Sequence, residues 1–311
     1  MPATVSKDKY SMLKAVLHRA FAALGLLLAL AAPPASARTA PGGRPALWEV
    51  SDQDTTIYLF GTIHLLPEKY RWRTAKFDQA LAGSQQLVLE TIVDNKNPAK
   101  LIGAMSSLAF NTPNLPPLAQ RVAPEKRAAL AAAIKKSGFP PQALDRMETW
   151  AAAITLLGNQ YKDMGLKGED GVEAILRETF ITNGKPIGEL ESNVEQLGFF
   201  DTLPEKAQRE LLEGSIDDSK SMSRELSDML SAWGRGDVGA IAASFNRDLS
   251  GSPELEQALI KRRNANWSRW IEQRMTQPGA IMIAVGAGHL AGRDSVIDLL
   301  QRDGYRVRRV Q

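Results

Sequence analysis

Two apolar runs near opposite ends of the chain each end in a glycine that is followed, three residues later, by a histidine. The first run, TIYLF, leads into Gly61 and His64, and the second, AIMIAV, leads into Gly286 and His289. Short runs of aliphatic and β-branched residues are typical of buried strands. Strands that alternate with helices form α/β sheets, in which functional groups gather at the carboxyl ends of the strands. Both GxxH segments are predicted to lie at such ends.

Both histidines outside residues 1–37, which are described below as a predicted leader, have glycine three positions before them. The chain has three histidines, and His18 lies within the leader. A single histidine at the end of a strand is more often a packed residue than a working one. Glycine makes up only 24 of the 311 residues, so its presence three positions before both remaining histidines is improbable by chance. We therefore interpret His64 and His289 as a functional pair.

The segments around the two histidines follow one plan of strand, GxxH turn, helix and strand. The strands and helices of this plan are predicted at residues 46–50, 56–60, 74–82 and 86–90, and again at 280–285, 293–304 and 305–310. Helical patterns fill most of the chain between them, at 124–139, 140–159, 168–184 and 204–277, with a strand at 185–191. The predicted fold class is α/β, a mixed-sheet core of two similar strand-GxxH-helix-strand halves with a long helical insertion.

The first 37 residues are predicted to be a secretory signal peptide. Four basic residues precede the apolar run 20–32, and the small residues ASA at 35–37 fit a cleavage site. The apolar run is too short to span the ~30 Å hydrocarbon core comfortably, which favours cleavage over anchoring. Residues 38–45 read as a flexible lead-in to one domain, 46–311. The leader predicts an exported protein, either periplasmic or secreted.

Composition excludes several classes of partner and chemistry. Without the four basic and one acidic residues of the leader, the chain carries 34 of each sign, so its charge does not indicate nucleic-acid binding. It has no cysteine, which excludes disulfides, thiolate nucleophiles, cysteine-ligated zinc and lipoprotein anchoring. No later segment reads as a membrane span. P-loop, dinucleotide-binding, G-x-S-x-G and H-E-x-x-H motifs are also missing.

The residue types at the two turns suit metal or acid/base chemistry. Glycine lets the backbone turn sharply and approach a ligand, which is the expected role of Gly61 and Gly286. Two neutral imidazoles with a carboxylate form a facial metal set that can activate water. Without a metal, an imidazole can itself act as a general base.

Carboxylates are expected at the same sheet edge. Glu90 ends the apolar run QLVLE, and Glu189 and Glu191 close the run PIGELE on one face of that strand. Glu173 is a further site candidate, because it could reach the same edge from a predicted helix start, where its simpler role is interaction with the helix dipole. Arg263 shares a helix face with tryptophans, a pattern more typical of stacking than of anion binding.

These motifs resemble the TraB/GumN family, which is related to the pheromone-shutdown proteins and the Tiki Wnt-cleaving metalloproteases. The matching segments run from about residue 46 to 310: LWEV, TIYLFGTIHLLP, LVLET, GEDGVEAIL, GKPIGELESNVEQL, RRNANW and IMIAVGAGHLAGRDSVIDLLQRDGYRV. The resemblance implies a core like those of the erythromycin-esterase and haem-binding ChaN proteins. It also implies metal-dependent proteolysis, with manganese or cobalt suggested by the Tiki branch.

Carried onto this chain, the family's motif residues are His64, His289, Glu90 and Glu191, with the RN pair at Arg263 and Asn264. The family more often has glycine where Glu189 stands, so the role of Glu189 stays open.

The leading hypothesis is an exported metal-dependent hydrolase, a peptidase, with metal held by His64, His289, Glu90 and Glu191. Glu90 is expected as a third ligand or as the general base. The alternatives are a metal-independent, esterase-like hydrolase and a non-enzymatic protein that binds haem or peptide. A peptide or protein is the expected partner. Substrate, metal and oligomeric state are left open by the sequence.

Overall fold

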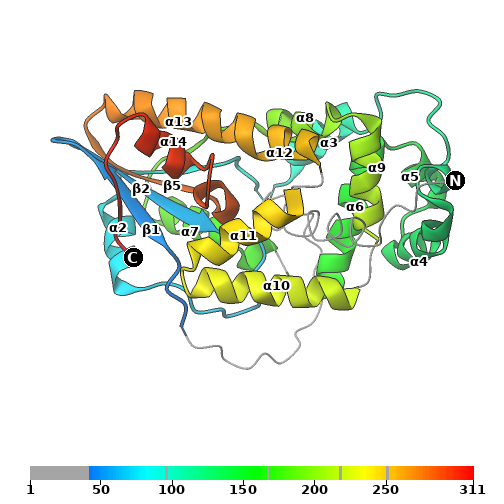
Figure 1. Cartoon of the computed structure of the whole chain (residues 1–311), viewed down its shortest axis with the longest axis horizontal. Coiled ribbons are helices and arrows are strands. Elements are labelled where there is room, and N and C mark those ends of the chain that lie inside the picture. The colour runs from blue at the N-terminus through cyan, green and yellow to red at the C-terminus, as the bar shows by residue number, and fades with distance from the viewer. Residues whose placement is uncertain (1–41, 95–96, 165, 167, 217–218, 250–251) are drawn as a thin grey trace, which may run out of the picture.

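The computed structural model describes residues 42–94, 97–164, 166, 168–216, 219–249 and 252–311 (Figure 1). The described residues form one six-stranded sheet in the order β4-β3-β5-β2-β1-β6. Its strands are β1 (Leu47–Ser51), β2 (Thr55–Thr62), β3 (Gln86–Leu89), β4 (Ile187–Glu189), β5 (Gly279–Gly286) and β6 (Val307–Arg309). The predicted leader, 1–37, lies outside the described residues.

The sheet is mixed, and β1 is the strand that runs against the others. β4, β3, β5 and β2 pair in parallel, whereas β1 pairs antiparallel with both β2 and β6. The α/β class with a mixed sheet is therefore confirmed. Both ends of the chain follow the predicted strand-turn-helix-strand plan, but their last strands differ in position. β3 lies inside the sheet beside β5, and β6 forms an edge. The finer likeness to the erythromycin-esterase and ChaN folds stays a prediction.

Alternating side chains of the central strands fill two separate cores. In β5, Ile281 and Ile283 belong to one core, and Met282 and Ala284 belong to the other. This is the period of two that a strand buried on both faces requires. Helices α13 (Arg262–Met275) and α14 (Val296–Arg302) cover the first face, and α2 (Ala75–Gly83) and α7 (Val172–Thr182) cover the second.

The insertion is helical, as predicted, and much of it extends beyond one end of the sheet (Figure 1). Its further helices are α3 (Ala99–Leu108), α4 (Arg127–Ser137), α5 (Pro141–Asp145), α6 (Thr149–Asp163), α8 (Asn193–Asp201), α9 (Glu205–Gly214), α10 (Ser219–Gly234), α11 (Val238–Leu249) and α12 (Pro253–Glu256), with short 3₁₀ turns at Leu118–Gln120, Pro124–Lys126 and Gly168–Asp170. A further 3₁₀ turn, Ala287–Leu290, follows β5. No helix in the described part of the chain is long and apolar enough to cross a membrane.

The single helix predicted at 140–159 is wrong in its bounds. The chain forms two helices there, α5 and α6, and α6 continues through Gly158 to Asp163. Carbonyl groups of Asp145 and Met147 at the break accept hydrogen bonds from Arg121 instead of from helix amides. Of the predicted lead-in, residues 42–45 are described. Gly43 and Arg44 donate backbone hydrogen bonds to Arg71 and Gly234.

Arg121 ties the break between α5 and α6 to the preceding loop. Its side chain is buried, and its guanidinium donates to the carbonyl groups of Pro116 at 2.7 Å, Met147 at 2.6 Å and Asp145. Burial lowers the pKa of Arg121, and the charges of nearby acidic groups oppose this shift. One arginine thus supplies the donors for three carbonyl groups that no helix satisfies.

We predict that Arg121→Met lowers the free energy of unfolding by about 3 kcal/mol, because it leaves these carbonyl groups unpaired in a buried place. Urea unfolding measures the loss. Arg209→Ala is the matched control, since Arg209 makes a half-exposed pair with Glu205. Its effect should stay within about 1 kcal/mol. Equal losses in the two variants would contradict the structural role of Arg121.

Candidate functional site

Four predicted site residues meet at one edge of the sheet because their strands are neighbours. Glu191, Glu90, His289 and His64 follow the carboxyl ends of β4, β3, β5 and β2, in the order of those strands in the sheet. Glu189 pairs with Leu89 and Gly286 pairs with Thr62, so the chain ends its four strands at nearly the same level. The two GxxH turns, 225 positions apart in sequence, therefore lie side by side.

Close packing of backbone explains two of the glycines. A Cβ on Gly61 would lie 3.0 Å from the Cα of Ala287, in the neighbouring turn. A Cβ on Gly171, at the start of α7, would lie 2.0 Å from the carbonyl oxygen of His64. Val172 also donates a backbone hydrogen bond to Ile63. The start of α7 is therefore seated directly on the first GxxH turn.

Arg263 joins the two glutamates of the edge. Its side chain is fully buried, and its Nε donates to both carboxylate oxygens of Glu191, at 3.1 and 3.0 Å. Its Nη2 donates to Glu90 at 2.8 Å. The backbone N–H of Gly286 donates to the other oxygen of Glu90 at 2.6 Å, and Trp267 donates to Glu191 at 2.9 Å. Gly286 thus serves the site through its backbone, not through a left-handed turn.

Charge and burial act in opposite directions within this network. Burial favours the neutral form of Arg263, but Glu90 and Glu191 outweigh it, so the pKa of Arg263 is raised. Burial raises the pKa of Glu191, and the nearby guanidinium only partly opposes this rise. A π-helical turn at Gln257–Lys261 directly precedes α13, which carries Arg263 as its second residue. Such turns are frequent at functional sites.

His289 is fully buried behind the guanidinium. Asn264 donates through Nδ2 to the carbonyl of Asp294, which leaves its Oδ1 as the acceptor for Nδ1–H of His289 at 2.6 Å. Nε2 of His289 is therefore the acceptor, and it lies 3.2 Å from Nη1 of Arg263. Burial, Arg263 and His64 together lower the pKa of His289 well below its ordinary value. The imidazole is neutral and held at both nitrogens.

His64 belongs to a second, more accessible group. Its Nδ1 lies 2.7 Å from Oε1 of Glu173, and the hydroxyl of Thr62 donates to the same oxygen. Burial opposes ionisation of Glu173, but the charge and hydrogen bond of His64 outweigh it and lower the pKa of Glu173. His64 is 9% exposed and His289 is 0% exposed, but the exposed part of His64 does not include Nε2, which is buried in this structure. Glu173 also lies in the first turn of α7, so the predicted dipole interaction accompanies its pairing with His64.

The donor set does not fit a divalent cation in this arrangement. Both oxygens of Glu191 and one of Glu90 already face Arg263, and Nε2 of His289 accepts from the same guanidinium. Across the described ranges, no cluster of three or more His, Asp or Glu side chains is placed to hold a metal ion. Arg263 on α13 already provides the positive charge next to Glu90 and Glu191 that a metal ion would otherwise provide. The metal itself stays a prediction.

Of the residues not yet described, one predicted candidate has a structural role, and two residues that were not predicted contact the site. Glu189 is exposed, and its Oε2 accepts from the backbone N–H of Ile92 at 2.7 Å, so it fixes the loop after β3. Sequence reasoning missed Gln196, which donates to Glu90 at 3.2 Å from α8. It also missed Thr62, although this residue lies inside the first GxxH segment. Gln196 lies within the family-like segment GKPIGELESNVEQL, but neither its residue type nor its position indicates a contact with Glu90.

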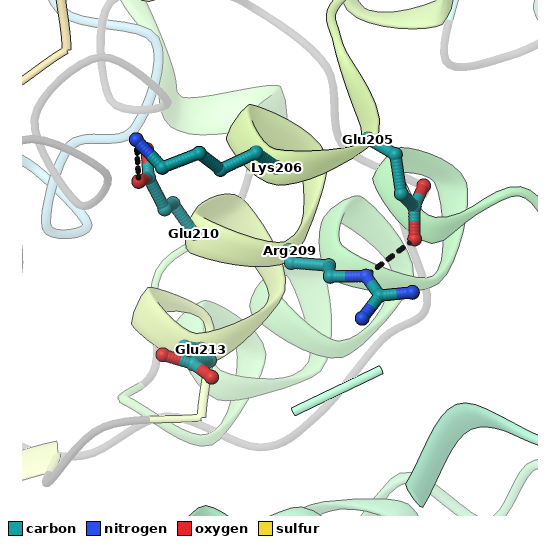
Figure 2. Close-up of a pocket in the computed structure, with 5 residues that line it drawn as sticks. All are labelled: Glu205, Lys206, Arg209, Glu210 and Glu213. Carbon is teal, nitrogen blue, oxygen red and sulfur yellow. Dashed lines mark hydrogen bonds and ion pairs between the residues drawn. The ribbon is translucent and has the colours of Figure 1, made fainter. Parts of the chain in front are cut away.

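A groove on the outer face of α9 carries many charges but none of these residues. Glu205, Lys206, Arg209, Glu210 and Glu213 line it (Figure 2). Its charges are paired along the helix, with Arg209 at 2.8 Å from Glu205 and Lys206 at 3.5 Å from Glu210. Glu213 accepts from the backbone N–H of Ala123. The groove is a solvated helix face.

We predict that Arg263→Gln destabilises the protein by about 3–5 kcal/mol at neutral pH, because it leaves Glu90 and Glu191 buried without a cation. Protonation of one carboxyl relieves this repulsion, so its pKa in the folded variant rises above the unfolded value. The loss should therefore be smaller at pH 5 than at pH 8 in denaturant unfolding. An identical loss at both pH values would contradict the pairing.

The low pKa of His289 also predicts how stability depends on pH. The folded protein keeps His289 neutral, whereas the unfolded chain takes up a proton below its ordinary value of 6.5. Stability contributed by the neutral form is present above this value and is lost as the pH falls, by at most about 1.4 kcal/mol per pH unit. His289→Gln should flatten the slope between pH 7.5 and 5. An unchanged slope would show that His289 titrates normally.

Comparison with known proteins agrees with the family that the sequence motifs resemble. The family model for TraB/PrgY/gumN proteins matches residues 46–309. The uncharacterized protein YbaP of Escherichia coli (strain K12) is 25% identical over 250 residues, which cover 79% of this chain and 88% of that protein. Uncharacterized protein YbaP of Shigella flexneri is 25% identical over 249 residues, or 78% and 87% of the two chains. No solved structure matches the chain. The protein belongs to the TraB/PrgY/gumN family.

Proposed function

We propose that this protein is a hydrolase in which His64 is the general base and Glu173 orients it. The observation that carries the proposal is the 2.7 Å contact between Nδ1 of His64 and Glu173 at the carboxyl edge of the sheet. A carboxylate on Nδ1 fixes the tautomer in which Nε2 is the basic nitrogen, and it stabilises the imidazolium that forms during proton transfer. General bases of this kind contribute about 10²–10⁴-fold to rate.

The reaction follows from these roles. Nε2 of His64 takes a proton from water as the water oxygen bonds to the substrate carbonyl carbon. The bond from that carbon to the leaving nitrogen or oxygen then breaks, and the imidazolium returns the proton to the leaving atom. Glu173, kept ionised by its contacts, balances the transient positive charge.

The buried network acts as a frame for this pair. The polar atoms of Arg263 and His289 already hydrogen-bond within the frame, so we assign both residues, with Glu90 and Glu191, to positioning and not to contact with substrate. Glu90 holds the N–H of Gly286, which begins the second GxxH turn. That turn packs against Gly61 of the first one. Through these contacts the frame supports the segment that carries His64.

The metal-dependent peptidase implied by the family resemblance is a second, separate proposal. The two histidines at neighbouring strand ends favour it, as does the 3.9 Å separation of Nε2 of His289 from Oε1 of Glu90. The position of Arg263 speaks against it. Peptide is the proposed substrate class in both forms. Export to the periplasm or the medium is proposed from the leader, and detection of the mature protein outside the cytoplasm would test it.

We expect His64→Gln and Glu173→Gln to lower kcat/KM by about 10²–10⁴-fold on whichever substrate of a peptide and ester panel the wild-type protein cleaves. Glu189→Gln is the control, because this exposed side chain only accepts from a loop amide. Its activity should match the wild type. Full activity in His64→Gln would overturn the general-base role.

The metal question is decided on the same samples. Activity that survives exhaustive chelation, with no bound metal found by elemental analysis, supports the metal-independent form. Activity that disappears on chelation and returns with manganese or cobalt supports the metal-dependent one. In that case His64→Ala and His289→Ala should each reduce the bound metal.

A further inference from the structure

Three buried side chains beside Glu90 carry polar atoms that have no hydrogen-bond partner. Thr91 and Asn193 are each 7% exposed, and Gln196 is 0% exposed. In the part of the chain that the structure describes, no partner is present for Oγ1 of Thr91, Oδ1 of Asn193 or Oε1 of Gln196. Buried polar atoms in native proteins are nearly always paired, so three exceptions in one place need an explanation. We call these three residues the acceptor patch.

Two hydrogen bonds place the acceptor patch at the end of β3. Nδ2 of Asn193 donates to the carbonyl of Ile92 at 3.1 Å, and Nε2 of Gln196 donates to Glu90 at 3.2 Å. Asn193 and Gln196 lie one turn apart on α8, and Thr91 lies between their two partners in the chain. The patch therefore adjoins the carboxylate that supports the second GxxH turn.

The chemistry of the patch follows from these contacts. The carbonyl of Ile92 and the carboxylate of Glu90 are acceptors, so each amide must turn its NH₂ group toward them. The atom left over on each amide is then its oxygen. Two acceptors and one hydroxyl match a ligand that donates, and an N–H group is the donor that peptides carry at every residue except proline. An ester has no hydrogen at the corresponding oxygen.

We propose that the acceptor patch recognises an N–H group of a peptide substrate and so selects peptides over esters. The inference rests on the proposed hydrolase function and names the substrate class of that site. Sites that hydrogen-bond a substrate N–H reject an analogue without it, because their own buried polar atoms then stay unpaired. The three unpartnered oxygen atoms are buried in the free protein. The proposal therefore requires neighbouring side chains to move when a peptide binds.

The test compares tetra-alanine with depsipeptide analogues in which each peptide N–H in turn is replaced by an ester oxygen. Binding is measured by calorimetry in the His64→Gln background, which separates recognition from turnover. The His64→Gln protein, without a change in the acceptor patch, should bind tetra-alanine at least about tenfold more tightly than it binds one of the analogues. Thr91→Val and Asn193→Leu should each reduce that ratio to within about twofold.

A stability measurement separates recognition from a structural role. Thr91→Val conserves shape and removes a buried hydroxyl that has no partner, so the thermal unfolding midpoint should rise while peptide affinity falls. Ser268→Ala is the matched control, since Ser268 on α13 is 3% exposed and its hydroxyl also has no partner. It should raise the midpoint and leave peptide affinity unchanged.

Equal affinity for tetra-alanine and every analogue, or no binding of any of them, would overturn the inference. So would a preference for tetra-alanine that survives unchanged in both Thr91→Val and Asn193→Leu. If the preference is present but wild-type protein hydrolyses nothing in the panel, the proposed hydrolase fails and the recognition of peptide N–H stands.

Discussion

The guanidinium of Arg263 between Glu90 and Glu191 is the interaction on which the rest of the site depends. Two carboxylates buried side by side repel each other and lose hydration, and their burial is tolerated only because a fixed cation lies between them. The same guanidinium meets Nε2 of His289. One side chain thereby links the ends of β3, β4 and β5 to α13, and it makes the sheet edge rigid before any ligand arrives.

Neighbouring strands carry residues with different roles, which are positioning at three strand ends and proposed chemistry at the fourth. The residues that follow β4, β3 and β5 are buried and fully engaged with one another, whereas the residue that follows β2 retains some exposure and pairs with a carboxylate from α7. The frame holds one cation, two carboxylates and a neutral imidazole, so it keeps one net negative charge, and it meets the first GxxH turn through a close packing contact. It therefore supports the His64–Glu173 pair through packing and hydrogen bonds. This division is the basis for assigning chemistry to His64 and positioning to Arg263 and His289.

Sequence alone predicted much of this edge, because local pattern and sheet topology are enough for it. Strand-end placement of His64, His289 and Glu90 follows from apolar runs and from the known location of functional groups in α/β sheets. The hydrogen-bond partner of each residue cannot be inferred from these patterns. Arg263 reads as a stacking residue because its helix face carries Trp267, and the structure shows that it stacks there and binds carboxylates as well. Glu173, Asn193 and Gln196 depend on helix packing across a hundred or so positions, which leaves no periodic signal.

The position of β5 in the sheet affects the order in which the chain can fold. This strand lies between β2 and β3, yet it is made of residues 279–286, which follow the whole helical insertion in the sequence. Until it arrives, β2 and β3 have no neighbour on their facing sides, and such unpaired edges invite aggregation. Completion of the sheet must therefore wait until the helical insertion and β5 have both been made. That order of events makes protection of the nascent strands a requirement for producing the protein.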